Sequence, residues 1–521
     1  MEKTKLLIAF LAIMLCCPAS TMAQKKKSKK PVKTEVKKDT VTVLKEQAAV
    51  GNANSQNTLG TWYYSGKNVK QDYETALKYW ALAAKQNHVE AIGNMGMCYQ
   101  YGRGTKKDSV LAVKLYEKAI AKGNQAVLQQ HIDLAEKKGD LFSCTLLHEI
   151  YKGDKGIAAD QKKAQHYLIK AAQGGNTESQ KTYAMLLLNQ KNTKESVKWF
   201  KELADKGNIT GIYYYGYQLF KGMGIKQDKV KGAEYLQRAA NRGVLAAYRQ
   251  LGAAYFDGEG VNQDYQKAVT YLQKAVTGRF ADSQMLLARC YMEGKGVKRS
   301  YEQAIQWLAE AASQNSKETE TVKKMIADNT DATFRSYVDG LKKYYVDKDY
   351  KSAANTFKKV EKEGINDGVT MQALILADED NPKANQKKAF KMMSEAAGQN
   401  AAATYYLSQM YKEGKGVEKN YQKADELLLK AAEEGNGYAL CKAGDMYFEG
   451  KGVAQDYVKA VDYYLQAEAQ SKLTTSSALH LIKCYEMGIS NLPDGDKKEE
   501  RIAALGKIRN TNKLLDILKK L

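Results

Sequence analysis

The stretch LGAAYFDGEGVNQDYQKAVTYLQKAV, which runs from Leu251 to Val276, decides the fold because the chain repeats it. Thirty-six residues later, from Leu287, the chain reads LARCYMEGKGVKRSYEQAIQWLAEAA. A second pair, LSQMYKEGKGVEKNYQKADELLLKAA from Leu407 and AGDMYFEGKGVAQDYVKAVDYYLQAE from Ala443, has the same spacing. A period held this strictly over several units predicts a repeat architecture, in which each unit buries its apolar face against its neighbours.

The first half of each unit predicts a helix. Ala247, Leu251, Gly252 and Tyr255 recur at helical spacing and therefore share one face. A glycine in mid-helix costs about 1 kcal/mol relative to alanine, and close packing of two helices at that point can offset the cost. A tyrosine three residues after the glycine recurs from unit to unit, as expected of a core position.

The second half of each unit predicts another helix, with Ala268, Leu272 and Ala275 on its buried face. It begins at a residue whose side-chain oxygen can accept a hydrogen bond from a free backbone N–H of the first turn. The predicted caps are Asp72, Asp228, Asp264, Asn420 and Asp456. One such helical hairpin cannot bury its apolar face alone, so stacked hairpins predict an all-α solenoid.

The repeat pattern resembles the Sel-one-like repeat family, which is related to the tetratricopeptide repeats. The matching residues in one unit are Leu251, Gly252, Tyr255, Gly258, Gly260, Val261, Asp264, Tyr265, Lys267, Ala268, Tyr271, Lys274 and Ala275. The resemblance implies a right-handed α/α superhelix of helix-turn-helix repeats of about 36 residues. It also implies a scaffold that binds other proteins, although a repeat fold by itself does not name a function.

The 521 residues divide into segments of different character, and the pattern weakens at 125–140, 177–208 and 316–400. An extra helix is expected at 125–140 and a unit with a shortened loop at 177–208. The predicted segments are a signal peptide at 1–23, a basic disordered segment at 24–52, a Sel-one-like array at 53–315, degenerate tetratricopeptide-like repeats at 316–400, a Sel-one-like pair at 401–472, and a half repeat with a capping helix at 473–521.

The start of the chain predicts export. Lys3 and Lys5 precede a short apolar run, and small residues up to Ala23 offer a cleavage site, which is the pattern of a secretory signal peptide. An uncleaved anchor is the alternative. No later segment is apolar enough to span a membrane. Secretion across the inner membrane places the protein in the periplasm or outside the cell and argues against nucleic acid as a partner.

The net charge of +22 suggests a second kind of partner. Residues 24–38 contain eight lysines and one glutamate. A run of like charge predicts a solvated, disordered tail, and it also suits attachment to an anionic envelope polymer or peptidoglycan.

The motif EGKGV, at 293–297, 413–417 and 449–453, does not predict a phosphate site. A phosphate-binding loop needs a serine or threonine after its lysine, whereas Lys295 is followed by Gly296. The position of Lys295 is also occupied by Glu259 in the preceding unit. The histidines and cysteines show no metal-ligand spacing, so no enzyme activity, cofactor or metal is predicted.

A partner would bind along the face that the first helices present together. Residues three before, one after and four after the repeated glycine are expected to face this concave groove. The candidate residues are Tyr213, Tyr217, Phe220, Arg249, Phe256, Arg289, Tyr405 and Gln409. Aromatic and basic side chains are frequent in peptide-binding surfaces. The leading hypothesis is an exported scaffold that binds a protein or peptide in this groove, and the alternative is a binding module for an anionic cell-envelope polymer or peptidoglycan. An enzyme acting on the cell wall is the third and least favoured hypothesis, because the sequence shows no catalytic constellation.

Overall fold

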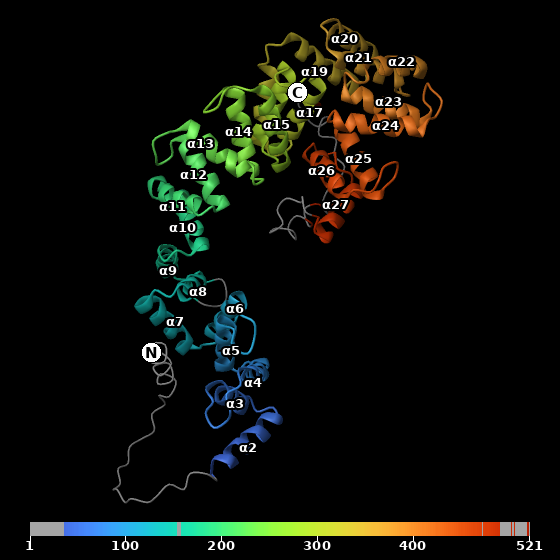
Figure 1. The fold of residues 1–521 in the computed structure, drawn as a ribbon. Coiled ribbons are helices and arrows are strands. Elements are labelled where there is room, and N and C mark those ends of the chain that lie inside the picture. Colours follow the sequence, from blue (N-terminus) through green and yellow to red (C-terminus); the bar gives the residue numbers. More distant parts are fainter. Residues whose placement is uncertain are drawn as a thin grey trace, which may run out of the picture. The chain divides into compact units, whose positions relative to one another are not determined.

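The computed structural model describes residues 36–153, 158–470 and 472–489, together with the isolated residues 502, 505, 518 and 519. The predicted signal peptide, most of the lysine-rich segment and most of the predicted capping helix lie outside these residues. The chain forms two compact units that divide between Asn176 and Thr177 (Figure 1). Throughout the described residues the secondary structure is helical, as the repeat pattern predicted.

The first unit contains eight described α-helices. They are α2 (Val36–Ala49), α3 (Ala53–Ser65), α4 (Tyr73–Lys85), α5 (Val89–Tyr101), α6 (Ser109–Ala121), α7 (Gln125–Lys138), α8 (Leu141–Tyr151) and α9 (Gln161–Gln173). Successive helices pack as antiparallel hairpins, and α7 is the helix that stands between two such hairpins.

The second unit continues the same alternation. Its helices are α10 (Thr177–Asn189), α11 (Thr193–Asp205), α12 (Ile209–Lys221), α13 (Lys229–Ala240), α14 (Leu245–Asp257), α15 (Tyr265–Ala275), the short 3₁₀ helix η2 (Val276–Gly278), α16 (Ala281–Glu293), α17 (Tyr301–Ala312), α18 (Ser316–Ala327), α19 (Ala332–Tyr345), α20 (Tyr350–Lys362), α21 (Asn366–Ala377), α22 (Gln386–Ala396), α23 (Ala401–Glu413), α24 (Tyr421–Glu433), α25 (Gly437–Glu449), α26 (Tyr457–Ala469) and α27 (Thr475–Met487).

The helix caps predicted from the sequence are confirmed. Each predicted residue lies just before a second helix, and its side chain accepts a hydrogen bond from a backbone N–H in the first turn. Asp264, for example, accepts from Lys267 N over 2.9 Å. The confirmed caps are Asp72, Asp228, Asp264, Asn420 and Asp456.

The EGKGV segments are corners of the repeats. Gly294 and Gly296 both have a left-handed backbone, with φ of +69° and +71°, which side chains other than glycine adopt at a cost. The backbone N–H of Gly294 donates to the carbonyl of Cys290 and closes α16. A Cβ on Gly296 would lie 2.2 Å from the carbonyl oxygen of Tyr265 in the preceding repeat. The second glycine therefore lets two repeats approach each other.

The lysine of EGKGV is engaged by the glutamate of the same motif. Lys295 Nζ lies 2.7 Å from Glu293 Oε2, and Lys451 Nζ lies 2.7 Å from Glu449 Oε2. In the third copy Lys415 lies 3.2 Å from Glu413 and 3.1 Å from Glu379. Each ammonium is thus paired within or beside its own corner, in agreement with the structural reading of the motif.

Residues 36–49 differ from the prediction, because they form helix α2 instead of a disordered segment. Ala48 is buried, and its carbonyl accepts a hydrogen bond from Gln56 Nε2 of α3 over 3.0 Å. Gln47 Oε1 accepts a second bond, from Ser55 Oγ, over 2.7 Å. The helix is ordered because it covers the open end of the first repeat, which would otherwise expose its apolar face.

The second unit curls back on itself. Helix α26, near the end of the array, contacts η2, which lies five hairpins earlier in the chain. Ala469 and Val276 belong to one continuous apolar core. Helix α17 lies within this curl, and ten of its twelve residues are buried. By comparison, four of the thirteen residues of α24 are buried.

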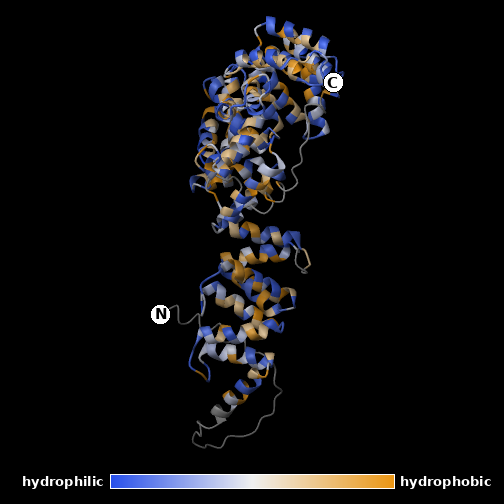
Figure 2. Cartoon of the chain, turned by 90° about the vertical axis from the view of Figure 1, so that its right-hand side faces the viewer, coloured by the Kyte–Doolittle hydropathy of each residue, from blue (hydrophilic) through white to orange (hydrophobic). Residues whose placement is uncertain are grey.

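No helix in the described ranges combines the length and the apolar character that crossing a membrane requires. Figure 2 shows why, since hydrophobic and hydrophilic residues alternate within the individual helices. The apolar residues form the cores between neighbouring helices.

Candidate binding pocket

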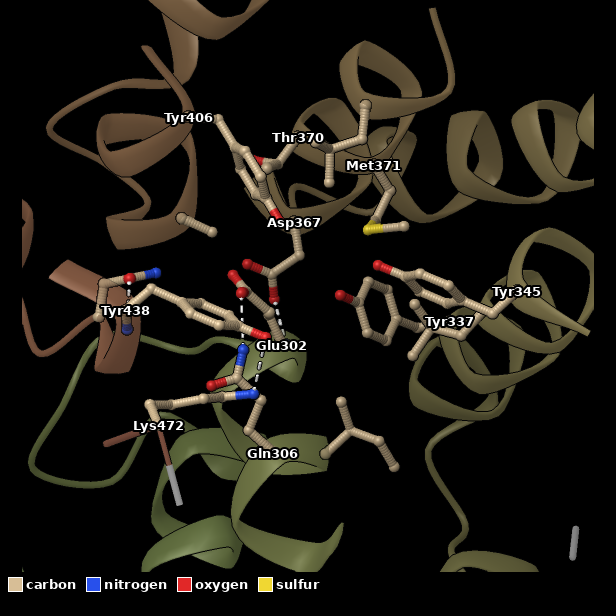
Figure 3. Close-up of a pocket in the computed structure, with 15 residues that line it drawn as sticks. Glu302, Gln306, Tyr337, Tyr345, Asp367, Thr370, Met371, Tyr406, Tyr438 and Lys472 are labelled. Atoms are coloured by element: carbon tan, nitrogen blue, oxygen red, sulfur yellow. Dashed lines mark hydrogen bonds between the residues drawn. The ribbon is translucent and has the colours of Figure 1, made fainter. Parts of the chain in front are cut away.

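A pocket of about 190 Å³ lies inside the curl of the second unit. Helices α17, α19, α21 and α23, the start of α25 and the residue Lys472 surround it (Figure 3). The residues that line it are Glu302, Ile305, Gln306, Tyr337, Leu341, Tyr345, Asp367, Thr370, Met371, Leu374, Ala402, Tyr406, Asn436, Tyr438 and Lys472. None of these residues was among the groove candidates predicted from the sequence.

Asp367 is a buried residue of the pocket lining and joins three helix starts. It lies in the first turn of α21 and is only 2% exposed. Its carboxylate accepts hydrogen bonds from Ser300 Oγ at 3.2 Å and from the backbone N–H of Glu302 at 3.0 Å, both at the start of α17. It also accepts from Asn400 Nδ2, and Asn400 is the cap of α23.

Glu302 is the second carboxyl group of the pocket and is half-buried in its wall. Its Oε1 accepts a hydrogen bond from Gln306 Nε2 over 2.8 Å. Figure 3 shows the carboxyl groups of Glu302 and Asp367 close together at the centre of the pocket. Burial, reinforced by the nearby charge of Asp367, raises the pKa of Glu302 to about 8. Burial also raises the pKa of Asp367 to about 6, although its hydrogen bonds oppose the shift.

Tyrosine rings form much of the remaining wall. Tyr337 and Tyr345 come from α19, and Tyr406 comes from α23. Burial raises the pKa of all three hydroxyl groups, so that they stay neutral at physiological pH. Tyr438, from α25, also lines the pocket and is 45% exposed, so we take it as the rim. The pocket therefore combines two carboxyl groups with aromatic surfaces.

Lys472 is the basic residue among the side chains that line this pocket. Its Nζ lies 4.3 Å from the centre of the Tyr438 ring and donates a hydrogen bond to the Tyr438 hydroxyl over 3.1 Å. Its charge lowers the pKa of Glu302, but by less than burial and Asp367 raise it. Lys472 thus contributes one positive charge to the lining and leaves the two carboxyl groups only partly compensated.

The same position in another repeat shows what is unusual about Glu302. Glu302 is the second residue of α17, and Glu74 is the second residue of α4. Glu74 is exposed and pairs with Lys78, one turn later, over 2.9 Å. In α17 the residue one turn later is Gln306. The carboxylate in the pocket therefore lacks the cation that its counterpart has on its own helix.

We predict that Glu302→Gln stabilises the protein at alkaline pH. The folded protein holds the proton of Glu302 up to about pH 8, whereas an unfolded chain loses it near pH 4.3. The wild type therefore loses stability as pH rises through this window, and a neutral glutamine avoids the loss. We expect Glu302→Gln to exceed the wild type by about 1–3 kcal/mol at pH 8.5 and to match it near pH 5. Urea denaturation at both pH values measures the difference, and a variant that is less stable at pH 8.5 would contradict this account.

Two of the predicted groove residues are placed wrongly by the sequence reasoning. Phe220 is 2% exposed and Phe256 is 4% exposed, so both belong to the core. Phe220 lies in the last turn of α12, where Gly232 of α13 comes so close that a Cβ would meet the Phe220 backbone. Phe256 packs edge-to-face on Tyr265, and Arg289 of the next repeat lies over its ring. The last turn of the first helix is thus covered by neighbouring elements.

The other candidates are accessible but do not form one site. Tyr213 and Tyr217 stack on α12, and Arg249 of α14 is close enough to lower the pKa of Tyr213, which burial raises overall to about 12. Arg249 pairs with Asp282 over 2.5 Å and Arg289 pairs with Glu293 over 2.6 Å.

Two further candidates lie on α23, near the pocket. Tyr405 stacks on Tyr438, with ring centres 5.8 Å apart, and so adjoins the rim. Gln409 lines a smaller hollow of about 40 Å³, together with Lys412 and Asp425. Tyr405 is therefore the sequence-predicted residue that comes closest to the pocket.

The sequence of one helix carries a signal for the pocket. Helix α17, YEQAIQWLAEAA, contains no lysine or arginine. The second helices of the other recognised repeats, such as α4, α15, α24 and α26, each contain at least one. A second helix without basic residues on its outer face indicates that this face is covered.

In the parts of the chain that the structure describes, no group of three histidine, cysteine, aspartate or glutamate side chains is arranged to hold a metal ion. The five cysteines there, Cys98, Cys144, Cys290, Cys441 and Cys484, are buried free thiols. Burial raises the pKa of the Cys98 and Cys290 thiols to about 12, which keeps them unreactive.

Comparison with known proteins agrees with the repeat geometry. The Sel1 repeat model matches residues 53–88, 89–124, 149–176, 189–208, 210–244, 245–278, 281–316, 378–400, 401–436 and 437–472. The matches at 189–208 and 378–400 fall in segments that were expected to depart from the pattern, so the family signal extends into them.

Curated relatives share parts of the array. "Protein sel-1 homolog 2" of Mus musculus is 34% identical over 110 residues, which are 21% of this chain and 15% of that protein. "DAP3-binding cell death enhancer 1" of Rattus norvegicus is 26% identical over 204 residues, 39% of this chain and 36% of that protein. The chain thus spans between about a seventh and about a third of the length of these relatives.

Among solved structures, a protective antigen of uropathogenic Escherichia coli strains that displays an SLR fold is 22% identical, with a TM-score of 0.35. The aligned region covers 91% of this chain and 98% of the antigen. Repeats of this kind generally mediate interactions between proteins and are generally not enzymes. With matches over more than half of its length, the chain belongs to the Sel1 repeat family.

Proposed function

We propose that this protein is an exported, non-enzymatic scaffold that binds a peptide segment of a partner protein in the curl of its second unit. The observation that carries the proposal is the pocket between α17, α19, α21, α23 and α25. It collects polar and aromatic side chains from helices that are far apart in the sequence. The proposal of export rests on the signal-peptide pattern of residues 1–23.

The size of the pocket favours a side chain over a complete small molecule. Pockets for drug-sized ligands measure about 300–1,000 Å³, whereas this one measures about 190 Å³. A single side chain of a larger partner suits this volume, and the exposed Tyr438 at the rim can contact the neighbouring residues of that partner.

A second surface supports contact over a longer stretch of partner. Tyr213 and Tyr217 on α12 and Arg249 on α14 form an accessible aromatic and basic patch within the same unit. Aromatic residues and arginine are enriched at the energetic centres of protein interfaces. We propose this patch as an additional docking point on the first helices.

Attachment to an anionic envelope polymer or peptidoglycan is the second candidate function. The observation in its favour is the net charge of +22, to which the lysine-rich residues 24–38 contribute strongly. The carboxyl-lined pocket would not serve such a ligand. Binding to isolated polymer should weaken steeply with added salt and should fall when residues 24–38 are deleted, and salt-insensitive binding would contradict it.

A crosslinking pull-down from the native envelope tests the leading proposal. We expect the tagged chain to recover a partner protein and Tyr438→Ala to reduce its yield at least fivefold. Tyr421→Ala is the matched control, because Tyr421 is also exposed but lies at the start of α24, away from the pocket. Equal loss with both variants, or no loss with Tyr438→Ala, would contradict binding at the pocket.

A further inference from the structure

We infer that the pocket recognises the cationic head of a lysine or arginine side chain of the partner, held between Glu302 and the surrounding tyrosine rings. This inference rests on the proposed scaffold function and specifies which chemistry the site selects. It follows from the carboxyl groups, from the missing cation on α17 and from the way in which Lys472 is already held.

The carboxyl groups supply the charge. Asp367 is fully engaged by donors at the starts of α17 and α23. Glu302 has one hydrogen bond, from Gln306, and its carboxylate faces the cavity (Figure 3). Across the described ranges, no lysine or arginine nitrogen lies within 4.0 Å of the Glu302 carboxylate. The pair Glu74–Lys78 shows the contact that the same helix position makes when a cation is available.

The aromatic rings supply a surface that cations prefer. A cation over a tyrosine face is attracted by the ring electrons, and more strongly where water is excluded. Tyr438 already holds the ammonium of Lys472 in this way, at 4.3 Å from the ring centre. The rings of Tyr337, Tyr345 and Tyr406 also line the pocket and offer further aromatic faces. A second cation entering from the partner would meet both these rings and Glu302.

The charge balance makes binding depend on pH. The groups that face Glu302 are Asp367 from α21, Gln306 from α17, Lys472 and the neutral tyrosines. Glu302 is largely protonated below pH 8 in the free protein, so a cation binds with release of that proton. Binding should therefore strengthen as pH rises from 6 to 8.5, while the lysine ammonium stays charged. An anionic or neutral ligand would show the opposite trend or none.

Titration of the purified full chain with blocked peptides tests the inference. The probe is acetyl-Gly-Gly-Lys-Gly-Gly-amide, observed by ligand NMR at pH 6.0 and 8.5. Two comparison peptides carry arginine or N-ε-acetyl-lysine in place of the lysine. In a third, norleucine replaces the lysine and the N-terminal α-amino group is left free. We expect the lysine and arginine peptides to bind at least tenfold more tightly than the acetylated one, and at least tenfold more tightly at pH 8.5 than at pH 6.0. Equal binding of the norleucine peptide would overturn the assignment to a side chain.

Glu302→Gln separates recognition from folding. We expect the variant to lose at least tenfold in affinity for the lysine peptide while its melting temperature at pH 8.5 is equal to or above that of the wild type. Glu74→Gln is the matched control and should bind as the wild type does. Unchanged binding by Glu302→Gln, or no preference for lysine over acetyl-lysine, would overturn the inference. If the yield of a recovered partner falls in Tyr438→Ala but is unchanged in Glu302→Gln, this inference fails and the scaffold function stands. If the lysine peptide binds but the pull-down recovers no partner, the recognition of a cation stands and the proposed scaffold function fails.

Discussion

Replacing Asp367 with alanine is expected to lower the free energy of unfolding by about 2–4 kcal/mol at pH 7. The carboxylate is buried and accepts hydrogen bonds from Ser300, from the backbone of Glu302 and from Asn400. Alanine leaves these donors without an acceptor. Relief of the buried charge offsets part of the loss, because burial already raises the pKa of Asp367 to about 6.

The matched control for this experiment is Asp456→Ala. Asp456 is also a carboxylate at a helix start, but it caps only its own helix, through Lys459 N at 3.0 Å. Loss of such a local cap costs about 0.5–2 kcal/mol. Urea denaturation followed by circular dichroism measures both variants. If Asp367→Ala costs no more than Asp456→Ala, then the link between α17, α21 and α23 does not stabilise the curl.

Replacing Gly296 with alanine is expected to be the most damaging change at a repeat corner. The left-handed backbone at this position costs alanine about 1–2 kcal/mol. In addition, the new Cβ would lie 2.2 Å from the carbonyl oxygen of Tyr265, so two repeats would have to separate. We expect a total loss of about 3–5 kcal/mol, because close-packed neighbours cannot yield without losing contacts elsewhere.

Gly294 allows the two contributions to be separated. Its backbone is also left-handed, but a Cβ there would meet Arg299 Cβ at 3.5 Å, which is an ordinary contact. Gly294→Ala should therefore show only the backbone cost of about 1–2 kcal/mol. Equal losses for the two variants, measured as denaturation midpoints, would show that the second glycine is not needed for the approach of neighbouring repeats.

Local features of the fold could be predicted from the sequence because the residues that determine them recur in each repeat. The cap at Asp264, the corner at Gly294 and the buried face through Ala268 depend on interactions within one hairpin or with the next one. Averaging over several units makes such signals strong. Helix α2 was not predicted, because its segment is strongly polar in composition. Its order depends on the contact with α3, through Ala48 and Gln56.

The pocket could not be predicted in the same way, because it arises where the periodicity is broken. Asp367 and the Glu302 backbone are 65 residues apart in sequence, and Lys472 comes from a still more distant repeat. Glu302 occupies a position that faces solvent elsewhere in the chain, as Glu74 does. Only the curl of the second unit turns this position inward. The absence of basic residues from α17 indicates that it is covered, but not by which elements.

The partner is expected to enter the curl of the second unit at the pocket. The most direct test replaces Tyr438 with the photo-crosslinking residue p-benzoylphenylalanine and maps the adduct formed in the native envelope by mass spectrometry. We predict an adduct on a partner peptide that contains lysine or arginine, and no adduct when the same residue replaces Tyr421 on α24. Adducts of equal yield from both positions, or an adduct from Tyr421 alone, would contradict the account.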